Sequence, residues 1–223
     1  MRCWRRLIAD RRAVAALEFA LLLPVLIVIT LSLTDVTNAA ITWWRMSAAA
    51  NAIARIATSY AATESNTNSL STSQATTAST AIFAVIPGLT TAPLSQYGVT
   101  LSSVVMTPTV TGCTSNCTYT ANTAWSVVAQ GTAGTARPCG TLGAAANDAS
   151  ATISTLPPDA FSSSPLLVVD VTYDFMPLFT NLFGVKLKWM ETAYMAPRTG
   201  TDADWIQLTG AQAAQAQCPG YTG

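Results

Sequence analysis

A single acidic residue, Glu18, lies within the longest apolar run of the 223-residue chain, from Ala13 to Leu33. A carboxylate in a bilayer core costs about 2.5–3.5 kcal/mol, and less near the membrane edge, so we expect Glu18 to have a cationic partner. Within the chain, its side chain could extend toward Arg11 or Arg12, at a helix start that also favours negative charge. Glu18 is therefore the leading candidate for chemistry in this sequence.

Two apolar residues near Glu18 are further candidates for helix contacts. We expect Phe19 to be a lipid-facing aromatic residue. Pro24 removes one backbone donor from a helix, which predicts a kink or a contact site for a second helix. The equal alternative is that Pro24 is an ordinary apolar component of the helix, with no kink and no contact role.

The cysteines fall into two groups, because Cys3 precedes the apolar run whereas Cys113, Cys117, Cys139 and Cys218 follow it. If the run crosses a membrane, the later four lie in an oxidising compartment, where disulfides persist. Four cysteines allow three connectivities, among which sequence alone does not decide. We favour Cys113–Cys117 with Cys139–Cys218. The alternative, a four-cysteine zinc site, is disfavoured because the spacing does not repeat a C-x2-C unit.

The remaining polar residues give no indication of catalysis. The chain has no histidine, which removes the commonest general base and metal ligand. It has no phosphate-binding glycine loop and no nucleophile elbow. Asp202 and Asp204 are interpreted as solvated loop acids, and Asp170 and Asp174 as charges on the wet face of a strand. We therefore predict a protein that is not an enzyme, with no catalytic residue, metal or cofactor.

Charge is distributed unevenly around the apolar run. Residues 1–12 hold five of the 11 basic residues, opposed only by Asp10: Arg2, Arg5, Arg6, Arg11 and Arg12. A run of about 20 apolar residues crosses a bilayer, and a short basic flank stays in the cytoplasm. We predict a cytoplasmic leader at 1–12 and a single transmembrane helix at 13–34. Six basic and 10 acidic residues follow, a balance that argues against nucleic-acid binding.

The helical pattern continues past the predicted membrane exit, giving one continuous helix to about residue 62. Residues 35–62 are predicted to be an exported extension of the helix, with these residues on one face: Val36, Ala40, Trp43, Ala50, Ile53, Ala57 and Tyr60. We expect Trp43 and Trp44 to form a packing surface for the globular domain. An aromatic belt at the membrane interface is the alternative.

Residues 63–223 are predicted to form an exported α+β domain with a flexible tail. A second helix is expected from about Ser71 to Ile86, and a helical turn at Met176–Phe183. Period-two patterns predict strands at 96–107, 117–130, 165–176 and 185–196. In the second strand, one face is expected to hold Tyr119, Ala121, Trp125, Val127 and Ala129. Residues 131–164 are interpreted as an irregular insertion, and 198–223 as a tail tethered only through Cys218. The strands predict a mostly antiparallel sheet packed on the long helix.

The run from Arg11 to Pro24 (RRAVAALEFALLLP) combines a basic leader, a small residue, Glu-Phe after four further residues, and an apolar stretch with an early proline. This pattern resembles the N-terminus of TadE-like (TadE/TadG) pilus assembly proteins, the minor pseudopilins of the tight-adherence, or Flp-type, pilus. A looser resemblance covers residues 165–198. The family usually has Gly before the cleavage site, where this chain has Ala13.

The resemblance implies a pilin-like fold and cleavage by a prepilin peptidase before Val14, which would make Glu18 the fifth residue of the mature chain. Glu18 could then pair with the free amine of a neighbouring subunit. The implied partners are other pilins or pseudopilins, the Tad secretion machinery and the peptidase, with homo- or hetero-oligomers forming through the N-terminal helix. The implied location is the bacterial inner membrane, with the C-terminal domain periplasmic or carried into an extracellular pilus.

Two alternatives remain open at this point. Ala13 in place of Gly favours an unprocessed, membrane-anchored periplasmic scaffold. Small residues around Asn38–Ala40 would instead suit a Sec signal peptide on a secreted binding domain or enzyme, although the apolar run exceeds the usual length of such a signal.

Overall fold

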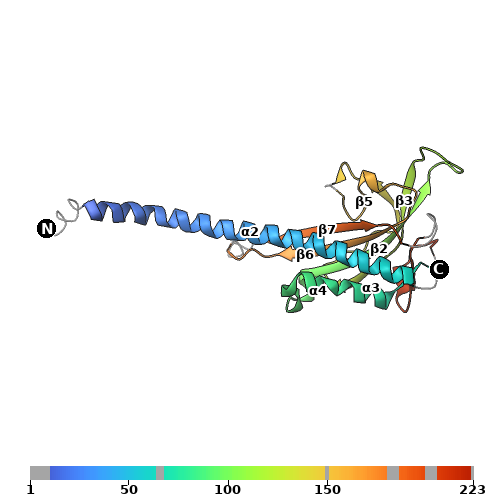
Figure 1. Ribbon diagram of the computed structural model, residues 1–223, viewed down its shortest axis with the longest axis horizontal. Helices are drawn as coiled ribbons and strands as arrows, with labels where there is room; N and C mark the ends of the chain where they lie inside the picture. The colour runs from blue at the N-terminus through green and yellow to red at the C-terminus, as the bar shows by residue number, and fades with distance from the viewer. Residues whose placement is uncertain (1–10, 64–67, 149–150, 180–185, 199–204, 222–223) are drawn as a thin grey trace. The chain divides into compact units, whose positions relative to one another are not determined.

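The computed structural model describes the chain except for residues 1–10, 64–67, 149–150, 180–185, 199–204 and 222–223 (Figure 1). The chain divides into two compact units. The first comprises Met1–Ile41 with Met176–Lys186, and the second Thr42–Phe175 with Leu187–Gly223. One helix, α2 (Arg11–Thr63), contributes residues to both units. The continuous helix predicted from the apolar and helical patterns is therefore confirmed.

Helix α2 contains no glycine, and Pro24 is its single proline. At 1.5 Å per residue its 53 residues extend for about 80 Å. In the first unit its side chains are mostly exposed and apolar, whereas in the second unit one face enters the core. This change in the surface of one helix coincides with the boundary between the two units.

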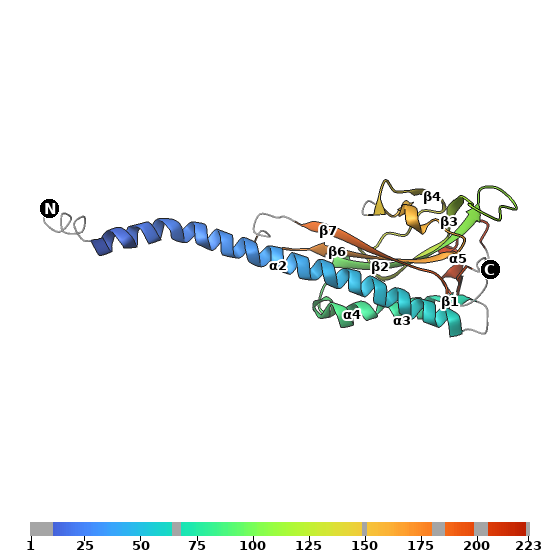
Figure 2. The same ribbon diagram turned by 45° about the horizontal axis from the view of Figure 1, so that its top comes forward.

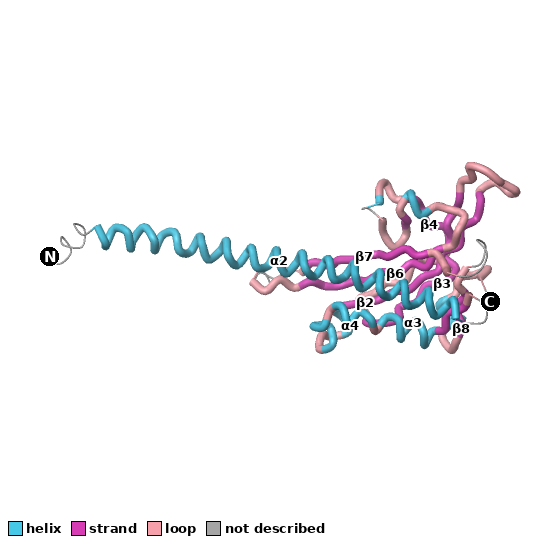
Figure 3. Tube along the Cα trace, viewed as in Figure 1, coloured by secondary structure: helices cyan, strands magenta, loops and turns pink. Residues whose placement is uncertain are grey.

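The second unit is built on a six-stranded sheet with the order β5-β4-β3-β2-β6-β7. Figure 3 labels five of these strands, β2, β3, β4, β6 and β7. The strands are β2 (Tyr97–Pro108), β3 (Tyr119–Gly131), β4 (Gly140–Ala144), β5 (Thr155–Leu156), β6 (Leu166–Phe175) and β7 (Leu187–Met195). All neighbours pair antiparallel except β4 and β5, which are parallel. The predicted α+β class, with a long helix packed on a mostly antiparallel sheet, is confirmed.

One face of the sheet packs against α2 and the short helices α3 (Thr72–Ser79) and α4 (Ala81–Val85). The buried stripe of α2 is mainly small, with Met46 and Ile53 as its larger members and Ala49, Ala50, Ala54, Ala57 and Ala61 between them. Alanine lets a helix approach a sheet closely. Trp125 of β3 is the largest fully buried side chain in this core, and its indole nitrogen donates to the Ile206 carbonyl at 2.6 Å.

The predicted packing face of α2 is only partly correct. Ala50, Ile53 and Ala57 are buried, but Val36 and Trp43 are 65% and 57% exposed. Trp44 is also exposed, so the two tryptophans do not form the expected packing surface. The Trp43 indole does donate a hydrogen bond to Glu191 of β7. The expected face is thus correct from Ala50 to Ala57 and wrong before Met46, because the apolar pattern alone does not show where the helix begins to pack on the sheet.

The second face of the sheet is covered by residues 131–164, which were expected to be an irregular insertion. That expectation is wrong, because the segment contributes β4, β5 and the 3-10 helix η4 (Pro158–Ala160). Figure 2 shows β4 on the opposite side of the sheet from α3 and α4. Leu142 and Leu156 join Val104, Leu166 and Val168 in a second hydrophobic core there. Residues 131–164 are mostly Gly, Ala, Ser and Thr, so no apolar alternation marked the two short strands in the sequence. Leu142 of β4 and Leu156 of β5 are the side chains that these strands contribute to the second core.

A β-bulge changes which face β3 presents along its length. Ser103 pairs with Trp125 and Val104 with Thr123, so Ala124 is an extra residue in β3. The bulge moves Tyr119 and Ala121 into the second core, whereas Trp125 stays in the helix-side core. The single apolar face predicted for this strand is therefore wrong, since one inserted residue reverses the alternation.

The connections of the second unit differ from expectation mainly at the C-terminus. The expected second helix is present as α3 and α4, with a Ser71 capping box and an end before the 3-10 helix η1 (Pro87–Thr90). A further 3-10 helix, η2 (Leu94–Gln96), leads into β2. The tail is not tethered only through Cys218. It forms β8 (Gln207–Thr209), parallel to β1 (Ser69–Ser71), followed by α5 (Ala213–Ala216), and it buries Ile206 and Leu208.

Candidate functional site

The N-terminal part of α2 presents an apolar surface on which Glu18 is exposed. Its neighbours Leu17, Phe19 and Leu21 have exposed fractions of 64%, 59% and 69%. One stretch between Ala16 and Ala62 is long and apolar enough to cross a membrane, and none of its 18-residue window is buried. Such a surface would be unstable in water and needs lipid or other helices around it.

Four hydroxyl groups between residues 30 and 37 are satisfied by the helix itself. Thr30, Ser32, Thr34 and Thr37 each donate to a carbonyl three or four residues earlier, at 2.8–3.0 Å. In an apolar medium an unpaired hydroxyl is costly, and such internal bonds remove that cost. These four residues are thus compatible with a membrane environment, whereas Glu18 carries a charge that such an environment disfavours.

The predicted processing residues lie at the described start of α2. Ala13 and Val14 are helical in their backbone. Of the topology residues, Arg11 and Arg12 begin α2, whereas Arg5 and Arg6 lie outside the described residues, as does Cys3. Pro24 lies inside the continuous helix and is exposed like Phe19. The acids of the D-x-D pair, Asp202 and Asp204, also lie outside the described residues.

Asp35 ties a distant loop to α2 within the first unit. Its carboxylate accepts from the backbone nitrogen of Leu178 at 2.8 Å and from that of Phe179 at 3.2 and 3.3 Å. Asp35 is 7% exposed, so these bonds compensate for removing a carboxylate from water. Leu178 and Phe179 lie in a turn where the helical turn was expected, and the rest of that turn, from residue 180, falls outside the described residues. The role of Asp35 was not predicted, although an acidic residue two positions past an apolar run is a signal in the sequence.

The structure corrects the interpretation of Asp170. It is 1% exposed and forms a bidentate pair with Arg137, with both N···O distances at 2.8 Å. Thr192 of β7 also donates to it at 2.7 Å. The face of β6 that was expected to be wet is thus buried, because the 131–164 segment covers it. Asp174 is only half-buried.

Arg137 holds that covering segment in place. Its remaining guanidinium nitrogen donates to the carbonyls of Thr152, Ile153 and Thr155 at 3.2–3.5 Å. The chain reaches this position by crossing β2 at Gly98, where a Cβ would lie 1.9 Å from the Gly134 nitrogen. One sequence signal could have found Arg137, since no other basic residue occurs between Arg55 and Lys186.

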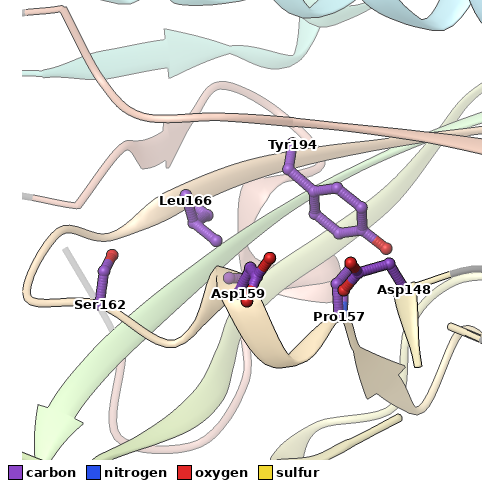
Figure 4. Close-up of a pocket in the computed structure, with 7 residues that line it drawn as sticks. Asp148, Pro157, Asp159, Ser162, Leu166 and Tyr194 are labelled. Carbon is purple, nitrogen blue, oxygen red and sulfur yellow. The ribbon is translucent and has the colours of Figure 1, made fainter. Parts of the chain in front are cut away.

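A cavity of about 440 Å³ lies beside this network, between β7 and η4 (Figure 4). Tyr194 projects into it from β7, and Asp148, Asp159 and Leu166 line it. Burial raises the pKa of Tyr194, an effect that the nearby Arg137 partly offsets and Asp170 reinforces. The phenol is therefore neutral near pH 7. Among the described residues, no group of three or more cysteine and acidic side chains could hold a metal ion.

The four cysteines of the second unit are paired. Cys113 bonds to Cys117 within the β2–β3 loop, and Cys139 bonds to Cys218 across a sequence separation of 79. This is the connectivity that the spacing favoured. Both pairings are compatible with an oxidising compartment.

An exposed apolar helix of membrane-spanning length, joined to a disulfide-bonded α+β domain, indicates a membrane-anchored protein. The family model described as TadE-like protein matches residues 13–55, so the chain carries a TadE-like segment. This match overlaps the run from Arg11 to Pro24 that carries the resemblance, and it relates the chain to the Tad pilus system at the level of the family. No match was found among curated proteins or solved structures.

Proposed function

We propose that this protein is a minor pseudopilin of a Tad-type pilus, cleaved by a prepilin peptidase before Val14. The observation that carries the proposal is that the TadE-like match coincides with an exposed apolar helix bearing one carboxylate, Glu18. Its function is packing: the helix joins a bundle of similar helices while the sheet domain faces the periplasm.

The orientation follows from charge. The basic leader at 1–12 stays in the cytoplasm, residues 13–34 cross the inner membrane, and the helix extension at 35–62 and the domain at 63–223 are exported. The disulfides Cys113–Cys117 and Cys139–Cys218 support export, because they persist in the periplasm and not in the cytoplasm.

Glu18 supplies the assembly contact in this proposal. Cleavage frees an ammonium group at Val14, and Glu18 of one subunit pairs with that amine on its neighbour. The pair neutralises both charges within the bilayer, where an isolated carboxylate costs about 2.5–3.5 kcal/mol. Phe19 and Pro24 lie on the same exposed helix and provide apolar contacts to neighbouring pilin helices.

The contacts of Asp35 argue against a secreted form cut near residues 38–40. Such a cut would remove Asp35 and release the backbone nitrogens of Leu178 and Phe179 that it binds. The folded first unit thus favours retention of the helix.

The mature N-terminus tests the proposal directly. Edman sequencing or intact mass of the membrane protein from its native host is expected to give Val14 as the first residue. Met1 would support the unprocessed scaffold, and a start near residues 39–41 would support secretion. Ala13→Gly serves as the matched variant and should be cleaved at least as well, whereas Ala13→Leu should accumulate the uncleaved form.

Carbodiimide cross-linking tests the role of Glu18, since this reagent joins a carboxylate to an adjacent amine. Treated membranes are expected to give a Val14–Glu18 peptide linking two subunits, and Glu18→Gln should abolish it together with piliation. Leu22→Met, which keeps an apolar side chain of similar volume at another exposed position of the helix, is the control and should retain both. Normal piliation in Glu18→Gln would contradict the assembly role.

A further inference from the structure

The loop after β6 is held against α2 near the end of the apolar run. Asp35 lies two residues beyond Leu33, and its buried carboxylate binds the backbone of Leu178 and Phe179. Both partners belong to the first compact unit. Because the bonds go to backbone nitrogens, they fix where the loop lies along the helix and leave its side chains free to face outward.

The outward side chains of this loop are apolar. Leu178 is 64% exposed and Met176 is 36% exposed, while Phe179 is partly exposed. Lys186, at the far end of the same unit, is exposed as well. In water, an exposed leucine and methionine beside an already apolar helix would enlarge an unfavourable surface.

The position along α2 identifies what covers these side chains. Two residues correspond to about 3 Å along a helix axis. The interfacial layer on each side of a bilayer core is about 5–8 Å deep, from a total of about 40–45 Å around a core of about 30 Å. If Leu33 marks the end of the membrane core, the Asp35 carboxylate and its loop lie at the level of the lipid headgroups.

We propose that Met176, Leu178 and Phe179 form a second membrane contact, inserted into the outer leaflet of the bilayer that α2 crosses. This inference rests on the proposed transmembrane position of residues 13–34. Lys186 has the charge complementary to anionic headgroups. The loop thereby gives the exported domain a second attachment to the bilayer besides the helix.

Spin labels on the full-length chain test this proposal in vesicles of phosphatidylethanolamine and phosphatidylglycerol. Cys3→Ser removes the cysteine outside the two disulfides, and Leu178→Cys then introduces the labelling site. Collisions with oxygen, which concentrates in lipid, are compared with collisions with a water-soluble nickel complex. We expect oxygen collisions to dominate at position 178.

Two further label positions make the outcome decisive. Val110→Cys, in the β2–β3 loop, is the matched control, because Val110 is 65% exposed and Leu178 64%, and nickel collisions should dominate there. Leu22→Cys reports on the span itself. If oxygen collisions dominate at position 22 and nickel collisions at position 178, the membrane contact of the loop is overturned and the membrane span is not. If nickel collisions dominate at both positions, the membrane span is overturned as well. Few collisions of either kind at 178 would mean that protein covers the loop, which also overturns its membrane contact.

A second variant tests the role of Asp35. In Asp35→Ala the label at position 178 is expected to lose its excess of oxygen collisions, approaching the value at position 110. Thr37→Ala removes an exposed hydroxyl that donates to the Leu33 carbonyl of its own helix, and it should leave the value unchanged. An unchanged value in Asp35→Ala would show that the loop contacts lipid without the carboxylate, and would overturn the tether.

Discussion

At the scale of single residues, a buried ion pair with several further hydrogen bonds lies in places that looked unremarkable in sequence. Arg137 and Asp170 come from a low-complexity segment and from an alternating strand, and each is almost fully buried. A buried pair of this kind requires that every lone pair and proton be satisfied. Here Thr192 and three backbone carbonyls complete the network.

Replacing Arg137 should therefore be strongly destabilising. Arg137→Met leaves Asp170 buried without its cation, and we expect the free energy of unfolding to fall by about 3–5 kcal/mol. Urea unfolding of the full chain in detergent, followed by tryptophan fluorescence, measures this. Arg55→Met removes the charge of an exposed arginine and should change stability by less than about 0.5 kcal/mol. Equal effects of the two substitutions would contradict a structural role for the pair.

We predict that the free energy of unfolding falls in alkali because of Tyr194. Burial raises its pKa in the folded state above the ordinary 10.0, so the unfolded phenol loses its proton first as the pH rises. The stabilising contribution is therefore complete below about pH 10 and declines above it. Tyr194→Phe should flatten the decline measured by urea unfolding between pH 9 and 11. Tyr173→Phe should act in the same direction, since burial raises that pKa too. Unchanged slopes in both variants would refute the assignment.

At the scale of elements, α2 has two kinds of surface along one continuous helix. Its N-terminal part is exposed and apolar, and its hydroxyls bond to their own backbone. Its C-terminal part packs mostly alanine against the sheet. The first surface suits lipid or neighbouring helices, whereas the second requires close approach to a fixed partner.

A larger side chain in the alanine stripe should disrupt that approach. Ala54 is fully buried, and Ala54→Leu is expected to cost about 1–3 kcal/mol through overpacking. Arg55→Leu places the same side chain at the adjacent exposed position and should lie within about 0.5 kcal/mol of the wild type. Urea unfolding of the two full-length variants in detergent measures the difference. A stable Ala54→Leu would imply unfilled space between α2 and the sheet.

At the scale of the whole molecule, the two disulfides close loops of very different length. The pair Cys139–Cys218 spans 79 positions and joins the segment after β3 to the tail, whereas Cys113–Cys117 spans 4. A longer loop restricts the unfolded chain more. The first disulfide should therefore contribute most of the covalent stabilisation.

Removing each disulfide by paired serine substitutions tests this difference. We expect a loss of about 4.5 kcal/mol for Cys139→Ser with Cys218→Ser, and about 2 kcal/mol for Cys113→Ser with Cys117→Ser. Thermal and urea unfolding of the oxidised full-length protein give the two values. The reverse order would mean that the tail is held mainly by β8 and the Trp125–Ile206 bond.

The local sequence pattern was sufficient to predict a helix or strand wherever a single period of apolar side chains dominated the segment. The sequence predicted the helix through residue 62 and the strands β2, β3, β6 and β7, because helix and strand periods are properties of a single segment. It also contained the apolar run with Glu18 and the motif from Arg11 to Pro24 that carries the resemblance. The structure then agreed on the helix and these strands.

Tertiary structure alone decided what covers each face. Three features join segments that lie far apart in the chain: the Arg137–Asp170 pair, the bonds from Asp35 to the loop after β6, and the buried tail. A fourth, the change of face in β3, depends on the single inserted residue Ala124. The alternation of a strand indicates that its two faces differ. Only the tertiary structure shows whether the polar face is exposed to water or covered by another segment. Asp170 looked solvated for that reason and is buried.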